Sequence, residues 1–324
     1  MNTLPGRLYP KFRLVLAPLA LALLIAGCGG EKRSSTVRAE RIANGHVILN
    51  IASDPSSLNP NLANELGAAR AIVGLQRGLT MLDTQSRPHP ELAERWEISE
   101  DGRTYTFYLR DAQWTNGESV TAEDFVYSWT RRMLDPTFGS INAYQFFYIK
   151  GAKAFYQDPS LGPDSVGVRA LASNVLQVEL ENPTPFFLQL VAHHSYFPVH
   201  AATDRENPNW HQHTGSYVGN GPYRLTDYEP GYRIVMEKNP LYWDADNVHM
   251  QCVTLFMIEQ ESTERIAFEN GELDATQNVP QQDIAALSSR PEYRVAPQVA
   301  TYFLNINTRE APLSDPRVRR ALNL

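Results

Sequence analysis

The chain has 324 residues, which is enough for two domains of ordinary size. Hydrophobic residues make up 43% of it and aromatic residues 10%, so it can bury a large core, which excludes an intrinsically disordered protein. Its formal net charge of −7 argues against a nucleic-acid-binding protein, because such proteins need a surface of clustered lysine and arginine.

The first 27 residues are predicted to be a secretory signal and not part of the fold. Three basic residues precede an apolar run over residues 14–26, which is shorter than the ~20 residues that a bilayer-spanning helix needs. The run ends in Ile-Ala-Gly-Cys, which resembles a lipobox, where a lipoprotein is cleaved before its lipidated cysteine. We therefore expect Cys28 to be the first mature residue and to carry a membrane anchor. Removal of residues 1–27 takes the net charge from −7 to −10.

Residues 28–45 are polar and charged, which predicts a flexible tether between the lipid and the fold. Order is expected from His46, because residues 46–51 form a short apolar run that stops at a turn-forming Asp-Pro-Ser-Ser. A helix is expected over about residues 68–79. The fold thus begins with a buried strand and a helix.

Hairpins are predicted between residues 87 and 181. Asp101-Gly102 and Asn116-Gly117 are dipeptides that accept positive φ in tight turns, and residues 104–110 alternate between apolar and polar, as a half-buried strand does.

A capped amphipathic helix is predicted to follow. Thr121 to Asp124 resembles a capping box, and Phe125, Trp129 and Met133 recur every four residues before Pro136 stops the helix.

The remaining predicted elements alternate strands with short helices. The strands are residues 166–169, 175–181, 232–237 and 253–258, and the helices are residues 185–190, with Phe186, Phe187 and Leu190 on the apolar side, and 262–270, which Gly271 closes. We interpret the chain as an α/β lobe, residues 46–77 plus 186–300, interrupted by an inserted hairpin-rich α+β subdomain, residues 78–185. Cys252 sits in an apolar run and is expected to be a small buried hydrophobic residue.

At the carboxyl end, Asp315-Pro316 is the expected start of a helix, with an N-cap followed by a proline suited to the first turn. The sequence stops at Leu324, where this helix has barely begun. We therefore expect a truncated chain.

Eight stretches, in order, resemble the extracellular solute-binding proteins of family 5, which include oligopeptide-, dipeptide-, murein-peptide- and nickel-binding proteins. They are residues 93–99 with 101–102 (AERWEIS, DG), 105–110 (YTFYLR), 114–117 (WTNG), 120–129 (VTAEDFVYSW), 220–223 (NGPY), 238–243 (KNPLYW), 270–274 (NGELD) and 313–322 (LSDPRVRRAL). Each stretch alone is weak evidence, but eight in family order are strong. Residues 127–148 are most similar to the oligopeptide branch.

The resemblance implies an α/β fold like that of type II periplasmic binding proteins, with an extra α+β subdomain and a second lobe that begins at residues 301–324 and is largely missing. It implies a lipid-anchored extracytoplasmic receptor that captures short peptides in a cleft and delivers them to the permease and ATPase subunits of an ABC importer. It also implies a monomer with no catalysis and no cofactor.

Alignment by motif places three patches near the implied cleft: Asn64, Glu65 and Leu66; Asn142 and Tyr144; and Gly219, Asn220 and Gly221. The small residues of the third patch would let a ligand backbone approach closely. The alternative for each patch is that it forms an ordinary loop or turn and does not contact a ligand. Glu261, after the strand over residues 253–258, is either a partner for a positive ligand group or a helix-start acid.

The sequence also contains candidate residues for metal binding and for hydrolysis. His193-His194 and His211-x-His213 could share a metal ion, but no cysteine or carboxylate cluster completes a shell, so surface histidines and no metal site are expected. The acidic residues Glu97, Glu100, Asp101, Glu123 and Asp124 could serve a hydrolase, but each has a place in a turn or a helix cap. The rivals to peptide capture are a murein-peptide or nickel carrier and an inactive receptor fragment.

Overall fold

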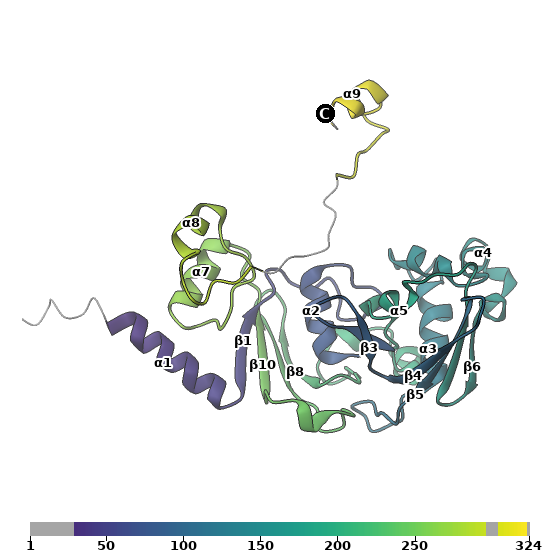
Figure 1. The fold of residues 1–324 in the computed structure, drawn as a ribbon, viewed down its shortest axis with the longest axis horizontal. Helices are drawn as coiled ribbons and strands as arrows, with labels where there is room; N and C mark the ends of the chain where they lie inside the picture. Colours follow the sequence, from purple (N-terminus) through teal and green to yellow (C-terminus); the bar gives the residue numbers. More distant parts are fainter. Residues whose placement is uncertain (1–28, 296–303, 323–324) are drawn as a thin grey trace, which may run out of the picture. The chain divides into compact units, whose positions relative to one another are not determined.

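The computed structural model describes residues 29–295 and 304–322, the side chains of 29–34 excepted, and divides into two units (Figure 1). The first unit ends at Val279 and the second runs from Pro280 to Leu324. The predicted signal sequence and Cys28 lie outside the described residues. None of the described helices is long and apolar enough to cross a membrane.

The first unit contains a mixed four-stranded sheet, sheet A, with the strand order β1-β10-β9-β8 (Figure 1). β1 and β10 are parallel, with His46 beside Cys252 and Asn50 beside Phe256, and the other pairs are antiparallel. The strands are β1 His46–Asn50, β8 Tyr223–Glu229, β9 Arg233–Lys238 and β10 Cys252–Phe256. Helix α2, Leu66–Leu75, packs on β8 and β9.

A second four-stranded sheet, sheet C, is antiparallel throughout, with the order β4-β5-β7-β6. Tyr105, Phe107 and Leu109 of β5 are buried while the residues between them are half-exposed, which confirms the predicted alternation. The strands are β4 Ala93–Ile98, β5 Thr104–Leu109, β6 Val168–Ala172 and β7 Val175–Glu179, and a separate hairpin consists of β2 Thr80–Leu82 and β3 Pro88–Pro90.

The helices between the strands are mostly short. The remaining α-helices of the first unit are α1 Gly29–Ala43, α3 Ala122–Tyr127, α4 Ala152–Gln157, α5 Phe187–Leu190, α6 Ala201–Glu206 and α7 Glu261–Glu269. The 3₁₀ helices of this unit are η2 Ala143–Tyr148, η3 Pro159–Leu161, η4 Pro163–Ser165, η5 His194–Tyr196, η6 Trp210–Gln212 and η7 Ala245–Asn247. The helix predicted over residues 262–270 is α7, and Gly271 follows it with φ +79°.

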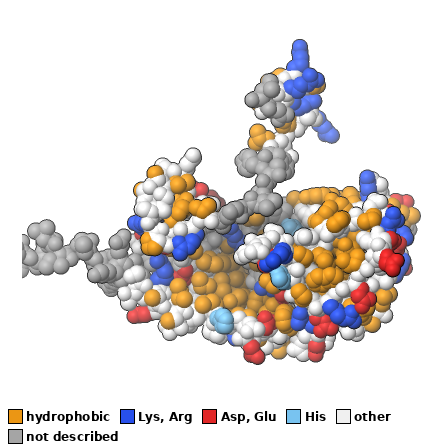
Figure 2. All heavy atoms as spheres, in the orientation of Figure 1, with side chains coloured by type: hydrophobic (Ala, Val, Ile, Leu, Met, Phe, Trp, Pro, Cys, Tyr) orange, Lys and Arg blue, Asp and Glu red, His pale blue; other side chains and the backbone are white. Residues whose placement is uncertain are grey.

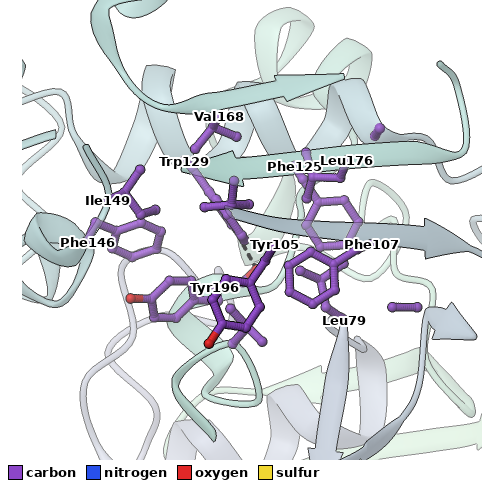
Figure 3. Packing of buried hydrophobic residues seen from close by; sticks show 14 of the residues in the cluster. Leu79, Tyr105, Phe107, Phe125, Trp129, Phe146, Ile149, Val168, Leu176 and Tyr196 are labelled. Carbon is purple, nitrogen blue, oxygen red and sulfur yellow. Dashed lines mark hydrogen bonds between the residues drawn. The ribbon is translucent and has the colours of Figure 1, made fainter. Parts of the chain in front are cut away.

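The core over sheet C is rich in aromatic rings. Trp129, Phe146 and Tyr196 are fully buried, the rings of Phe146 and Tyr196 stack with centroids 4.1 Å apart, and the Trp129 indole donates to the carbonyl of Tyr196 at 2.9 Å (Figure 3). A second cluster of buried residues, which includes Ile51, Leu75, Ile234 and Leu255, packs on sheet A. The division at residues 77/78 and 185/186 stays a proposal, and Phe187, Val191 and Tyr196 pack in the cluster over sheet C although they follow the second boundary.

The buried carboxylate of Glu91 connects the two sheets. Its Oε1 accepts from the Tyr242 hydroxyl at 2.6 Å and the Trp243 indole at 3.2 Å, both just after β9, and lies 3.3 Å from Nε of Arg77, just after α2. Glu91 itself lies between β3 and β4. The guanidinium of Arg110, at the end of β5, stacks on the Trp243 ring at 3.6 Å.

The predicted flexible tether is wrong where the structure describes it, because α1 occupies Gly29–Ala43. Arg41 donates to the carbonyl of Gly271 at 3.0 Å and to Asp274 at 2.5 Å, and Arg38 donates to the carbonyls of Phe268 and Leu273. These carbonyls lie at the end of α7, where orphan acceptors need partners. The polar residues that predicted a tether therefore include Arg38 and Arg41, the donors that dock this helix.

The predicted capping box is confirmed, but the helix that it starts changes type. After α3 the chain continues as a π-helix, η1, over Ser128–Met133. The Ser128 hydroxyl donates to the carbonyl of Asp124 at 2.6 Å and the Thr130 hydroxyl to that of Val126 at 2.7 Å. Such bonds back to the preceding turn compete with the regular ladder. Phe125, Trp129 and Met133 are nevertheless all fully buried, as the spacing predicted.

Smaller differences concern single residues. Phe186, predicted on an apolar helix side, is 46% exposed and packs edge-on against Tyr148. Cys252 is half-buried and not fully buried, because it lies at the first position of β10. β8 was not predicted, since a register shift between Leu225 and Asp227 interrupts its alternation.

The second unit contains η8 Gln281–Asp283, α8 Ile284–Leu287 and α9 Pro316–Ala321. The helix predicted to start at Asp315-Pro316 is therefore present, and the Asp315 carboxylate accepts from the Arg317 amide at 2.8 Å.

The first prediction concerns the docking of α1. The Asp274 side chain is only 4% exposed and also accepts from the Ile48 amide at 2.6 Å. Asp274→Ala should lower the free energy of unfolding by about 3 kcal/mol, because it removes the carboxylate that pairs with Arg41 and accepts from the β1 amide. Denaturant unfolding measures this. Asp164→Ala, at an exposed acid, should cost under about 0.5 kcal/mol, and equal losses in the two variants would contradict the assignment.

The second prediction concerns alkaline pH. The Tyr127 hydroxyl donates to the buried Asp204 at 2.7 Å, and burial together with this bond raises the pKa of Tyr127 from 10.0 to about 12. A tyrosine whose pKa is higher in the folded state stabilises the fold below its unfolded pKa, and this stabilisation is lost as the pH rises through the folded value.

Stability should therefore fall between about pH 10 and pH 12, and Tyr127→Phe should make that fall shallower by about 1 kcal/mol per pH unit. Denaturant unfolding across this range tests the prediction. An identical pH dependence in the wild type and the variant would show that Tyr127 does not titrate as described.

Candidate functional site

The parallel strands β1 and β10 end at the same edge of sheet A, where open α/β sheets commonly bind ligands. Asn50, 5% exposed at the end of β1, fixes this edge. Its side chain donates to the carbonyl of Ile258 at 3.0 Å and accepts from the amides of Ile258 and Ala52 at 2.8 and 3.1 Å. The loops that follow both strands therefore start from one tied point.

The loop after β1 is held from within by buried asparagines. The amides of Leu62 and Ala63 both donate to the carbonyl of Asn59 at 3.0 Å. The side chain of Asn61, fully buried, donates to the carbonyls of Ser195 and Phe197 at 3.2 Å. This part of the loop is thereby fastened to the segment around η5.

The second predicted patch contacts the carbonyl of Ala63, the residue just before the first patch. The Asn142 amide donates to it at 3.2 Å and the His194 ring at 3.0 Å. Ala63 immediately precedes Asn64, and Tyr144 lies two residues after Asn142. The structure therefore brings together patches that are some eighty positions apart in the chain.

The first patch projects into solvent. Leu66 is 74% exposed, Asn64 is exposed and Glu65 is half-buried. Glu65 is the N-cap residue of α2, yet its side chain makes no capping hydrogen bond, so the first-turn amides of α2 have no side-chain cap. Figure 2 shows hydrophobic side chains gathered on one face of the molecule, with acidic and basic ones interspersed.

In the second patch, Asn142 and Tyr144 have different surroundings. Asn142 is 8% exposed. Its side-chain oxygen accepts from Gln145 at 3.3 Å, and its side-chain nitrogen donates to the carbonyl of Ala63. Tyr144 and Ile141 are each 62% exposed. Tyr144 is therefore the residue of this patch that a ligand can reach, and Asn142 is engaged within the protein.

The third patch packs against the end of α2. A Cβ on Gly219 would lie 2.3 Å from the carbonyl oxygen of Leu75, and one on Gly221 would lie 2.5 Å from the Gln76 nitrogen. Asn220, 1% exposed, accepts from the Arg77 amide at 2.8 Å. The close approach that these glycines permit is made here by the protein's own backbone. Their contact with a ligand stays a prediction without support in this geometry.

Glu261 is exposed and begins α7, three residues after Ile258. It is thus a helix-start acid at the same sheet edge as the first patch, which leaves a role towards a cationic ligand group as a prediction.

The expectation of surface histidines is wrong for His194 and His211, each 7% exposed. His211 shares a hydrogen bond of 3.1 Å with the Ser57 hydroxyl. Burial lowers the pKa of both rings. The sequence signal that was missed is His194's place beside an apolar run, residues 196–199.

The remaining polar candidates are the metal ligands and the acidic residues considered for hydrolysis. Within the described ranges, no three histidine, cysteine or acidic side chains are grouped to hold a metal ion. Asp101 accepts from the Ser99 hydroxyl at 2.5 Å in its turn, and Asp124 accepts from the Thr121 amide at 2.9 Å in the capping box.

Comparison with known proteins identifies the family. Residues 87–324 match the family described as bacterial extracellular solute-binding proteins, family 5 Middle. The oligopeptide-binding protein OppA of Bacillus subtilis is 35% identical over 320 residues, which are 96% of this chain and 58% of that protein. The chain therefore spans little more than half of the length of this relative.

Two solved structures share the fold. The OppA structure of Burkholderia pseudomallei has a TM-score of 0.82 at 32% identity, and the murein tripeptide binding protein MppA of Escherichia coli has 0.81 at 34%. Each match covers 86% of this chain and 55% of the other. These neighbours confirm the predicted α/β fold of the type II periplasmic-binding-protein class. This chain belongs to the bacterial extracellular solute-binding proteins of family 5.

Proposed function

We propose that this chain forms part of the solute-binding component of an ABC importer and that it captures oligopeptides without chemically changing them. The observation that carries the proposal is that the Asn142 amide, two residues before the exposed Tyr144, donates to the carbonyl of Ala63, the residue that precedes the exposed Asn64. The family, which includes peptide-binding relatives, supports peptide as the solute.

The chemistry of these patches suits an extended peptide. An extended peptide needs hydrogen-bond partners for its backbone, which strand-like pairing with a receptor backbone supplies. The exposed Leu66, Ile141 and Tyr144 offer apolar surface to peptide side chains. Backbone groups hold the peptide and loosely fitting apolar surfaces accept its side chains, so affinity depends little on peptide sequence.

The finer parts of the proposal concern the whole receptor. A second lobe would close over the peptide by a hinge motion, and the permease with its ATPase subunits would accept the closed form. A lipid on Cys28 would hold the receptor, as a monomer, on the extracytoplasmic face of a membrane. The lipobox-like motif supports the lipid anchor, and the family relationship supports the other steps.

Murein peptide is a second candidate ligand, because the murein tripeptide binding protein is among the structural neighbours. Murein peptides share the backbone chemistry above but carry extra charged groups. Separate binding measurements with the two peptide classes distinguish the candidates.

Native mass spectrometry of the purified chain with an equimolar pool of tri- to pentapeptides should show bound peptides of mixed sequence. A parallel sample receives murein tripeptide. Binding of murein tripeptide alone would favour the second candidate, and the absence of any bound peptide would contradict the proposed function for this chain.

A matched pair of leucines tests the site itself. Leu66→Ala should weaken binding of the peptide pool about tenfold, because about 1.4 kcal/mol of apolar contact with the ligand is lost. Leu171, 55% exposed at the far end of β6 in sheet C, is the control. Isothermal calorimetry measures both variants, and an equal effect of Leu171→Ala and Leu66→Ala would remove the first patch from the site.

A further inference from the structure

The carbonyl of Ala63 is an unusual anchor, because two buried side chains from distant segments share it. Asn142 precedes η2, and His194 begins η5. Their donor nitrogens lie 3.2 and 3.0 Å from the same oxygen. A carbonyl oxygen has two lone pairs, so both can be satisfied at once.

The two donors are themselves held in place. The Asn142 oxygen accepts from Gln145 at 3.3 Å, and the amide of Phe197 donates to the carbonyl of His194 at 2.9 Å. Because a carbonyl only accepts, His194 donates from Nε2, and burial favours its neutral form by lowering its pKa. The side chains of Asn142 and His194, which we call the clamp, therefore present two fixed donors to the loop.

Beyond Ala63 the exposed stretch is short, because Gly67 and Ala68 of α2 are again buried. Asn64 is exposed, and its amide reaches only the neighbouring Glu65 carboxylate, at 3.4 Å. The next backbone hydrogen bond along the chain is in the first turn of α2, where the amide of Ala69 donates to the carbonyl of Glu65 at 2.9 Å. The Ala63 carbonyl is thus the last tied point before the exposed residues Asn64 and Leu66.

We propose that Asn142 and His194 are positioning residues, which set the affinity for the captured peptide by clamping the Ala63 carbonyl and need not touch the peptide. This inference rests on the proposed function, because it assumes that the loop over residues 64–66 contacts the ligand. It gives Asn142 a different role from ligand contact, and it gives His194 a role that its sequence did not indicate.

Removing either donor should reduce the preorganisation of the loop without removing a contact to the ligand. Without the clamp, the loop samples other conformations, and the apparent affinity falls in proportion to the fraction that stays competent. His194→Phe keeps a ring of similar size and removes the donor, whereas His194→Gln keeps a donor. Asn142→Leu keeps the branching of the side chain and removes the second donor.

The experiment measures the affinity for the tri- to pentapeptide pool by calorimetry, together with hydrogen exchange of the amides of residues 64–68. His194→Phe and Asn142→Leu should each weaken binding about tenfold and speed this exchange, while His194→Gln should stay within about threefold of the wild type. His213→Phe, at an exposed histidine, is the matched control and should change neither quantity.

Thermal unfolding separates positioning from general damage. The exchange should accelerate at residues 64–68 and not throughout sheets A and C. Equal affinity for wild type and His194→Phe, or failure of His194→Gln to restore binding, would overturn the inference. If the wild type binds no peptide, the proposed function fails, and the exchange data still decide whether the clamp orders the loop.

Discussion

The arrangement of the site depends on the pairing of one buried carboxylate, that of Glu91. A buried charge is costly unless it is paired and hydrogen-bonded, and here Arg77, Tyr242 and Trp243 supply the partners. Arg77 follows α2 and the two aromatic residues follow β9, so the parts that surround sheet A are bound to the strand that leads into sheet C. Nearer to the site, the side chain of Asn61 donates to the carbonyls of Ser195 and Phe197 and so fastens the loop after β1.

The local parts of the fold could be predicted from the sequence, because short-range rules decide them. Strand β5 shows period-two burial, and the capping box of α3 forms between residues three apart. Helix α1 could not be predicted in this way. It has no strong apolar face, and the partners of Arg38 and Arg41 lie some 230 positions away along the chain. The π-helix η1 likewise depends on hydroxyl groups that bond to the preceding turn.

The candidate site was predictable in part. Family motifs indicated the loop over residues 64–66 and the segment over residues 142–144, but they could not show that both meet at one backbone oxygen. A carbonyl carries no sequence signal, and which residue of a polar pair turns inward depends on packing. Asn142 is therefore buried while Tyr144 faces solvent, and the glycines of the third patch serve the backbone contact with α2 instead of an open surface.

The docking of α1 has a mechanical consequence. Tension applied at the amino end of this helix would load the arginine contacts of Arg38 and Arg41 before it reached β1, since both precede β1 along the chain. Asp274 joins Arg41 to the Ile48 amide, so the force would be shared between the end of α7 and the edge of sheet A. Several bonds would have to break together for the strand to peel away, which makes the attachment resistant to pulling from that end.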